Sequence, residues 1–358
     1  MEGAPVGTAA SEGLSLEELR LAARNHGLPL EALRYPVTPV GLHYLLIHFD
    51  IPAVEAETFR LAVAGAVERP LSLSLDDLRG REQVTMPVTF ECAGNGRALL
   101  EPRPVSQPWL TEAVGTAEWR GTPLAPLLEE AGVEPSAVEV LFRGLDRGLE
   151  GDEPQAYERS LPLAEAQGAL LAYEMNGGPL PPQHGFPLRL VVPGWYGMAN
   201  VKWLAAITLL EKPFDGYQNA VSYRMYEADG TAGEPVTRML PRSLTVPPGV
   251  PEFMSRERYL DAGPVELSGR AWSGHGVIER VEVSTDGGSS FSDADLGPEL
   301  GRAAWRGWTC MWQAPPGEHV ICSRATDSAG NTQPLEPPWN LKGYANNALE
   351  RIPVIVAG

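Results

Sequence analysis

The sequence has few cysteines, with Cys92, Cys310 and Cys322 among 358 residues. No two of them form a CxxC pair and none begins a CxxCH motif. A disulfide framework, a cysteine zinc site of the usual spacing and covalent c-type haem are therefore excluded. One pairing, between Cys310 and Cys322, stays open. The chain also lacks the GxGxxG and GxxxxGK[ST] loops that bind dinucleotides and nucleotide phosphates.

Long apolar runs are absent as well. The first 25 residues carry acidic and polar side chains throughout, without the apolar core of a secretory signal. No later run reaches the roughly 18 apolar residues of a membrane span. We therefore expect no membrane partner and a soluble, cytoplasmic protein, or a periplasmic one if an export signal has been removed.

Positive charge is scarce. The chain has 28 Lys and Arg against 46 Asp and Glu, which gives a formal net charge of −18. Such a surface repels nucleic acid and anionic membranes, so neither is an expected partner. Local cationic sites are still compatible with this balance.

The length favours two domains. In the first part, strand and helix signals alternate without a strict βαβ repeat, which indicates a mixed domain of the α/β or α+β class. From residue 264 the pattern is all-β: residues 265–268 and 281–284 alternate apolar and polar, and residues 286–288 supply a hairpin turn. This predicts an immunoglobulin-like sandwich. We place the two domains at 1–235 and 236–358.

Local signals predict two helices and a loop in the first domain. Ser15 and Glu18 form a capping box that begins an amphipathic helix over 15–26, with Leu16 and Leu19 among its apolar residues.

A second helix follows Thr122, which is the expected N-cap before Pro123, and it ends at Gly132. After the apolar run 138–142, residues 144–146 are expected to turn into a polar loop.

The stretch 88–97 carries a cysteine at the end of a β-prone run. Gly94 and Gly96 permit a tight turn that presents the thiol, and Arg97 is expected to favour the thiolate form of Cys92. A thiolate of this kind would bind a soft metal. A buried cysteine ahead of an ordinary turn is the alternative on this segment alone.

Residues 177–203 form two loops rich in glycine and proline around one short strand. His184, Arg189, Asn200 and Lys202 lie in or beside these loops. Taken alone, they could be solvated surface residues. The functional interpretation is an anion or phosphate cradle.

Five motifs, in this order and spacing, resemble the sulfite oxidase family of molybdenum enzymes from about Pro36 to the C-terminus. They are FECAGNGR at 90–97, HGFPLR at 184–189, VPG at 192–194, VKW at 201–203 and WNLKG at 339–343. The resemblance implies a sulfite oxidase-type mixed α/β molybdopterin-binding domain followed by an immunoglobulin-like dimerisation domain.

Position by position, the resemblance implies that Cys92 is the thiolate ligand of molybdenum. The residues that would bind the molybdopterin cofactor are Tyr44, His48, Cys92, Asp146, His184, Arg189, Asn200 and Lys202. The residues that would form the substrate pocket are Arg97, Trp109, Tyr223 and Lys342. In such a site the two cations would hold an anionic substrate and the tyrosine would hydrogen-bond to it.

The sequence departs from the family in the substrate pocket. Leu46 replaces an arginine and Ile47 an asparagine, while Lys342 replaces another arginine and forfeits its bidentate fork. Trp195 and Tyr196 are bulkier than the residues of many relatives. These changes leave the cofactor site intact but make the substrate uncertain.

The first hypothesis is a molybdopterin-dependent oxidoreductase of sulfite oxidase type that transfers an oxygen atom to sulfite or a related small anion. It is expected to form a homodimer. Too little chain lies outside the two domains for a haem or flavin domain, so electrons would pass to an external acceptor, a cytochrome or oxygen. Two alternatives stay open: a molybdopterin reductase of a nitrate-like or S-oxide-like substrate, and a non-catalytic binding module.

Overall fold

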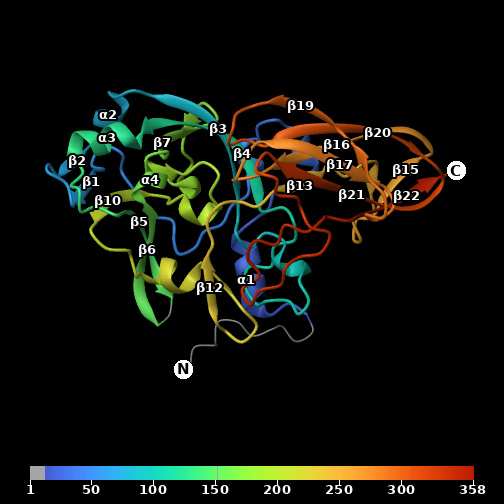
Figure 1. Ribbon diagram of the computed structural model, residues 1–358, viewed down its shortest axis with the longest axis horizontal. Helices are drawn as coiled ribbons and strands as arrows, with labels where there is room; N and C mark the ends of the chain where they lie inside the picture. The colour runs from blue at the N-terminus through green and yellow to red at the C-terminus, as the bar shows by residue number, and fades with distance from the viewer. Residues whose placement is uncertain (1–12, 151) are drawn as a thin grey trace.

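The computed structural model describes residues 13–150 and 152–358. Figure 1 shows two parts side by side along the long axis, an N-terminal part with α2, α3 and α4 and a β-sandwich that holds the C-terminus. No helix in these residues combines the length and the apolar character needed to cross a membrane.

Two sheets of five strands form the N-terminal part. One has the order β2-β1-β10-β5-β6, in which β1 runs parallel to β10 and the other neighbours are antiparallel. The other joins β3, β4, β7 and β8 in that order and adds β9 beside β7. The strands are β1 Leu61–Gly65, β2 Leu71–Leu73, β3 Val84–Glu91, β4 Val114–Pro123, β5 Glu139–Glu150, β6 Glu153–Pro162, β7 Leu170–Met175, β8 Gly178–Pro179, β9 Arg189–Val191 and β10 Leu204–Leu210.

Short helices connect these strands and cover their core. Val63, Phe142 and Ile207, from three neighbouring strands, are buried in one cluster with Leu127 of α3. Burial of these apolar faces is the main stabilising term for the part that carries the site. The helices are α1 Leu16–Arg24, α2 Leu75–Arg79, α3 Leu124–Ala131 and α4 Leu163–Ala166, the 3₁₀ turns η1 Leu30–Arg34, η2 Val40–Leu42, η3 Arg97–Leu99, η4 Pro182–His184 and η5 Gly197–Ala199, and the π-helical turn η6 Gln218–Ser222.

The C-terminal part is a sandwich of two sheets, with the orders β13-β16-β20-β19 and β14-β15-β22-β21-β17-β18. Leu267, Trp308 and Ile321 bury their side chains between the sheets. The strands are β13 Arg242–Thr245, β14 Val250–Pro251, β15 Arg258–Asp261, β16 Gly263–Trp272, β17 Ile278–Ser284, β18 Ser292–Asp293, β19 Asp295–Glu299, β20 Arg306–Ala314, β21 Gly317–Asp327 and β22 Ile352–Ala357.

The predicted α+β class, a mixed domain followed by a sandwich, is confirmed. A hairpin of β11 Arg224–Tyr226 and β12 Ala232–Pro235 precedes the sandwich. The domain border between residues 235 and 236 stays a prediction. Cys92, Cys310 and Cys322 are free thiols, so the pairing that stayed open is not formed.

Helix α1 has the predicted capping box but not the expected buried face. Ser15 Oγ accepts a hydrogen bond from Glu18 N at 3.2 Å, and Ser15 N donates to Glu18 Oε2 at 2.9 Å. Leu16 and Leu19 are 58% and 49% exposed, whereas Glu18 is 1% exposed. The reason is an ion pair between Glu18 and Arg103, which turns the acidic side chain inward.

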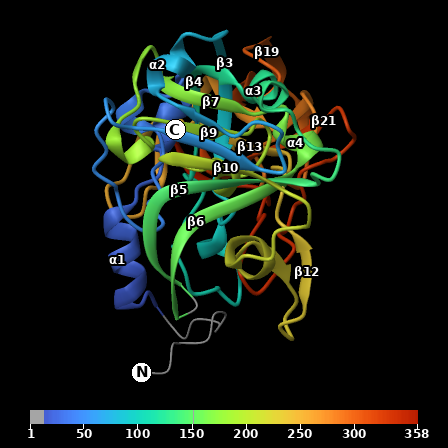
Figure 2. The ribbon, with the colours of Figure 1, turned by 90° about the vertical axis from the view of Figure 1, so that its left-hand side faces the viewer.

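Two other local predictions are wrong. Helix α3 has Pro123, not Thr122, as its N-cap, because Thr122 Oγ1 donates instead to Leu78 O at 2.8 Å. Residues 144–146 form no loop: β5 continues through them to Glu150 and pairs with β6 in a long curved hairpin (Figure 2). The pairing shifts register between Arg143 and Arg147, which marks a bulge that holds these residues.

Candidate active site

The Cys92 turn begins where β3 ends. Cys92 N donates to Ala113 O at 2.9 Å, and Asn95 N donates to Cys92 O at 2.9 Å, which closes the turn. Gly96 adopts φ of 87°, a conformation that favours glycine. The turn therefore has the predicted form, and it places Cys92 in the wall of a pocket.

The C-terminal tail packs against this turn. Ala345 N donates to Ala93 O at 2.8 Å, and Asn346 Nδ2 donates to Gly96 O at 2.7 Å. A Cβ at position 96 would collide with the Asn346 amide. Only glycine therefore allows both the left-handed turn and the close approach of the tail.

The thiol of Cys92 is not shifted toward the thiolate as predicted. Burial raises its pKa and outweighs the opposing effects of the Arg97 charge, the Gly94 backbone and the Trp109 indole. In the described residues, no three His, Cys, Asp or Glu side chains converge as a metal site. Cys92 has three neighbours that favour its anionic form.

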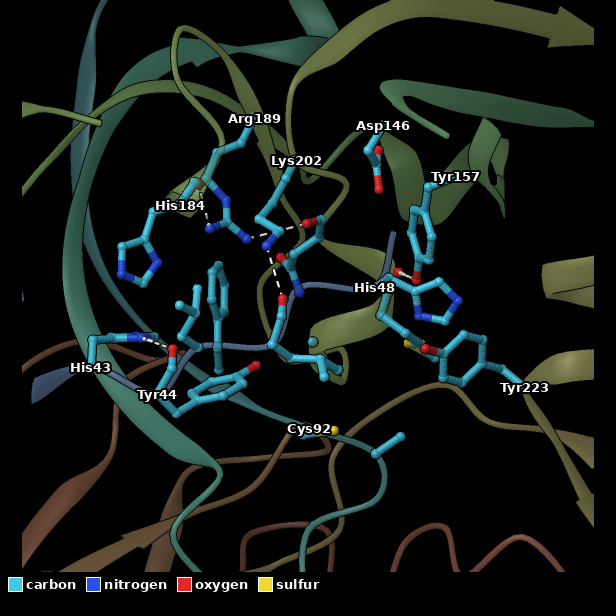
Figure 3. A pocket seen from close by; sticks show the side chains of 17 residues that line it. His43, Tyr44, His48, Cys92, Asp146, Tyr157, His184, Arg189, Lys202 and Tyr223 are labelled. Atoms are coloured by element: carbon cyan, nitrogen blue, oxygen red, sulfur yellow. Dashed lines mark hydrogen bonds between the residues drawn. The ribbon is translucent and has the colours of Figure 1, made fainter. Parts of the chain in front are cut away.

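The four residues predicted to form an anion cradle come together around one pocket (Figure 3). Arg189 donates from Nη1 to His184 O at 2.9 Å and from Nη2 to Asn200 O at 3.1 Å. Lys202 Nζ donates to Leu46 O at 2.8 Å. The loops around β9 therefore hold their cations against backbone carbonyls inside the protein rather than in solvent.

The electrostatics of this cradle show a surplus of positive groups. Burial, with repulsion from Arg189, lowers the pKa of Lys202 to about 7, and burial lowers the pKa of Arg189 to about 10. Burial likewise lowers the pKa of His43 to about 4 and that of His184 further. Among the described residues that line this pocket, Asp146 supplies the one carboxyl group, and burial raises its pKa to about 6.

Two buried polar atoms of the pocket have no hydrogen-bond partner in the described structure: His43 Nε2 and Asp146 Oδ1. Buried polar atoms normally have partners, and buried cations are normally paired. A phosphorylated pterin would provide hydrogen-bond partners through its ring nitrogens, and its phosphate would provide a negative charge to pair with the buried cations. The residues present therefore fit the cofactor that the sequence implies.

A second pocket opens on the other side of Cys92. Cys92, Leu46, His48 and Tyr223 line both pockets, so the thiol lies at their junction. The residues that line the second pocket only are Leu21, Ile47, Phe49, Arg97, Ser106, Gln107, Trp109, Leu149, Glu150, Ser222 and Tyr344. Three of the four predicted substrate residues, Arg97, Trp109 and Tyr223, are therefore brought together here.

Lys342, the fourth predicted substrate residue, does not line this pocket. Its Nζ donates to Val221 O at 2.6 Å and Ser222 O at 2.9 Å, and it lies 4.4 Å from the centre of the Tyr226 ring. Burial lowers its pKa to about 8. The ammonium group is thus directed to the carbonyls of η6 at the rim, while the Lys342 carbonyl accepts from Arg97 Nε at 2.7 Å.

Tyr223 and Trp109 each place a polar group in the second pocket. Burial raises the pKa of Tyr223 well above its ordinary value, so its hydroxyl stays protonated. The Tyr223 ring stacks on Tyr344 with 5.4 Å between ring centres. Trp109 Nε1 is buried without a nitrogen or oxygen acceptor, and the Cys92 sulfur is the group whose pKa it lowers.

Several lining residues were not predicted, and Glu150 is the most informative. Its side chain accepts from Gln218 Nε2 at 2.7 Å and lies 2.9 Å from His48 Nε2. The signal that was missed is the alternation of side chains along β5. Because β5 continues to Glu150, the side chains of Asp146 and Glu150 lie on the same, inward face of the strand. Tyr157 and His43 were likewise missed as lining residues.

The bulk of Trp195 and Tyr196 does not enter either pocket. Trp195 Nε1 donates to Glu165 Oε2 at 3.2 Å, and Tyr196 OH accepts from Leu240 N at 3.3 Å. These residues support the loop after β9 and leave the substrate side unchanged.

The sandwich also reaches the Cys92 turn. Glu91, the last residue of β3, accepts from Arg242 Nη1 of β13 at 2.9 Å and from Trp272 Nε1 of β16 at 2.9 Å. Asn95 Nδ2 donates to the same carboxylate at 3.0 Å. All four side chains are buried.

Two family profiles match the chain. The oxidoreductase molybdopterin binding domain matches residues 48–218, and the Mo-co oxidoreductase dimerisation domain matches residues 242–357. The first contains Cys92 and all cofactor-binding residues predicted above except Tyr44.

Among curated proteins, sulfite oxidase from Gallus gallus is 38% identical over 353 residues, which cover 88% of this chain and 72% of that protein. Human mitochondrial sulfite oxidase is 36% identical, with 90% of this chain covered, and the chain spans 62% of that relative's length. A nitrate reductase from Hordeum vulgare is 33% identical, and the match covers 89% of this chain and 39% of that protein.

Among solved structures, the sulfane dehydrogenase SoxCD from Paracoccus pantotrophus superposes with a TM-score of 0.79 at 26% identity, covering 98% of this chain and 92% of that one.

Proposed function

Because the chain belongs to the sulfite oxidase family of molybdopterin-dependent oxidoreductases, we propose that it oxidises a small sulfur oxyanion of the sulfite type by oxygen-atom transfer. The product gains one oxygen atom, which water ultimately provides. Two electrons and two protons leave, and the electrons pass to an external one-electron acceptor such as a cytochrome, or to oxygen.

The observation that carries this proposal is the position of Cys92 at the junction of two pockets of different character. One pocket gathers buried cations that suit a phosphate, and the other holds Arg97, Tyr223 and Trp109 beside the thiol. The alternative of Cys92 as a plain core residue does not agree with this placement.

The cradle residues would bind the cofactor in distinct ways. Arg189 and Lys202 supply positive charge for the phosphate, and the neutral His184 supplies a hydrogen-bond donor. Asp146, with its unpartnered Oδ1, would accept from the pterin, and Asn200 orders the loop by accepting from Val192 N at 2.7 Å. When bound, the molybdenum cofactor supplies two-electron oxygen-atom transfer, and Cys92 would be its protein ligand.

On the substrate side, the protein would orient the anion and shield it from water. Arg97 provides a permanent positive charge, and its Nε and Nη1 are fixed by Lys342 O and Gln107 O. The protonated hydroxyl of Tyr223 can donate to a substrate oxygen. Preorganised donors of this kind stabilise developing charge because they need no reorientation.

The homodimer and the cytoplasmic location expected from the sequence are also proposals. A match to a dimerisation domain over residues 242–357 supports the homodimer.

Steady-state assays on the cofactor-loaded enzyme test the function. We expect sulfite to reduce ferricyanide, and we expect the purified protein to contain molybdenum and a pterin. Absence of both molybdenum and pterin from protein expressed with the cofactor pathway would refute the proposal.

A reductase of nitrate or an S-oxide is the second candidate. It is favoured by the nitrate reductases among the relatives and by Leu46, which puts an apolar side chain in the substrate pocket. Oxidation of a reduced dye by nitrate, without sulfite oxidation, would favour this candidate over the first.

A further inference from the structure

The substrate pocket has almost balanced charge. Of the described residues that line it, Arg97 is the one Arg or Lys and Glu150 the one Asp or Glu, and His48 Nε2 lies 2.9 Å from Glu150 Oε2. A site that binds a dianion normally contains two or more cationic side chains. Among Arg and Lys, the described lining of this pocket offers one, and the carboxylate in the same space faces His48.

The Glu150 carboxylate is held in place and charged. Gln218 Nε2 donates to its Oε2 at 2.7 Å, and His48 Nε2 lies 2.9 Å from the same oxygen. Burial raises the pKa of Glu150, but the hydrogen bonds with His48 and Gln218 and the nearby positive charge, including that of Lys342, outweigh this effect and bring the pKa below its ordinary value. The negative charge of Glu150 also acts on two tyrosines of the pocket wall, because it contributes to the raised pKa values of Tyr223 and Tyr344.

The available cation is already partly used. Arg97 donates hydrogen bonds from Nε to Lys342 O and from Nη1 to Gln107 O. In the described structure, Nη2 is the guanidinium nitrogen without a hydrogen bond. Lys342 directs its ammonium group to Val221 O and Ser222 O and does not line the pocket.

Part of the pocket wall is apolar. It is lined by Leu21, Leu46, Phe49 and Leu149, and the Leu149 side chain is 75% exposed. Such a wall suits an alkyl group and gives no hydrogen bonds to a fully polar anion. A second negative charge on the substrate would lose hydration here without finding a second cation.

We propose that this pocket selects a singly charged organic sulfur oxyanion, an alkanesulfinate, over a dianion such as sulfite, and that Glu150 sets this preference. The inference rests on the proposed function and names its substrate class. The sulfinate sulfur carries a lone pair, forms one new S–O bond and becomes the sulfonate. Water provides the oxygen, two protons are released, and two equivalents of a one-electron acceptor are reduced.

Two inert anions of similar shape test this inference on the cofactor-loaded enzyme. Sulfate is a dianion and methanesulfonate a monoanion, and neither can be oxidised. Their dissociation constants are measured by calorimetry and as inhibition constants. We expect methanesulfonate to bind about tenfold tighter than sulfate. Equal or tighter binding of sulfate would overturn the inference without any mutation.

Glu150→Gln keeps the size of the side chain and removes its charge. We expect the preference for methanesulfonate over sulfate to fall about tenfold, and the ratio of kcat/KM for methanesulfinate over sulfite to fall in the same direction. Glu153→Gln removes an exposed carboxylate from the same hairpin and should leave both ratios unchanged. Molybdenum content and the unfolding temperature establish that each variant is folded.

An unchanged preference in folded, loaded Glu150→Gln would overturn the role of Glu150. Failure of the proposed function has a different signature: neither sulfite nor methanesulfinate is oxidised, although the inert anions still show their charge preference.

Discussion

Arg242 Nη1 lies 2.9 Å from Glu91 Oε1, and both side chains are buried at the contact between the two parts of the protein. Glu91 directly precedes Cys92. A residue of the sandwich therefore fixes the end of the strand that carries the sulfur.

Arg242→Met tests this link. It leaves the Glu91 carboxylate buried without its cation, so we expect a loss of about 3–5 kcal/mol in the free energy of unfolding, measured with denaturant. The double variant with Glu91→Leu should cost less than the sum of the single variants. Arg280→Met, at an exposed ion pair with Asp293, should change the free energy of unfolding little.

Cys92→Ser should abolish turnover and leave the fold intact. A serine hydroxyl is a poor ligand for a soft metal, so we expect activity to fall by more than about a hundredfold, while the unfolding temperature changes little. Cys310→Ser removes another free thiol and should keep full activity. Near-normal turnover in Cys92→Ser would rule out the assigned role.

The cradle should make the cofactor-free protein sensitive to pH and to anions. Lys202 has a pKa of about 7 in the folded state, against about 10.4 when unfolded. Between these values the unfolded chain binds more protons, so the contribution of Lys202 to stability rises with pH over this window and is lowest below pH 7.

Sulfate, whose charge is constant over this range, should therefore raise the unfolding temperature more at pH 6 than at pH 9. Lys202→Gln should remove most of this difference. Lys212→Gln, at an exposed lysine, is the matched control and should retain it. An equal effect of sulfate at both pH values would contradict an anion-binding role for the cradle.

Leu46→Arg would add a second cation beside Arg97. One charge-assisted hydrogen bond contributes about 1.5–3 kcal/mol, so we expect sulfate to bind the loaded enzyme at least about tenfold tighter and the KM for sulfite to fall. Leu46→Met keeps the apolar wall and should change neither value. If the arginine has no effect, the missing cation does not limit binding of dianions.

Glu350 gives a pH-dependent test of the contact between the parts. Its side chain accepts from Thr111 Oγ1 at 2.9 Å, and burial raises its pKa from 4.5 to about 7. The folded state binds more protons between these values, so this group lowers stability as the pH rises through them, and the penalty is complete above pH 7.

Glu350→Gln cannot ionise, so it should raise the free energy of unfolding at pH 8 by on the order of 2 kcal/mol and give no gain near pH 4. Denaturant unfolding at the two pH values measures both. Glu336→Gln, whose carboxylate is 76% exposed, should have no comparable effect. A gain of equal size at pH 4 would refute this explanation.

The sequence predicted most of the cofactor side because its signals are local. Gly and Pro on both sides of β9 indicated two shaped loops, and these loops do bring Arg189 and Lys202 together. The Cys92 turn was predicted for the same reason, since a strand followed by closely spaced glycines leaves few conformations.

The substrate side was predicted less well because it depends on pairing between distant segments. Glu150 reaches the pocket only because β5 continues through the bulge beside β6, and residues 144–146 alone resemble a turn. The reversed face of α1 depends on Arg103, far along the chain. The raised pKa of Cys92 reflects burial by many neighbours, which no local pattern reveals.

The hydrogen bonds from Ala345 and Asn346 to the Cys92 turn join segments that are far apart in the sequence, since Gly96 and Asn346 are separated by 250 positions. The turn that presents the sulfur therefore acquires these contacts only after residues 345 and 346 have been synthesised. Its final conformation depends on both parts of the protein, and the N-terminal part made alone would lack these contacts.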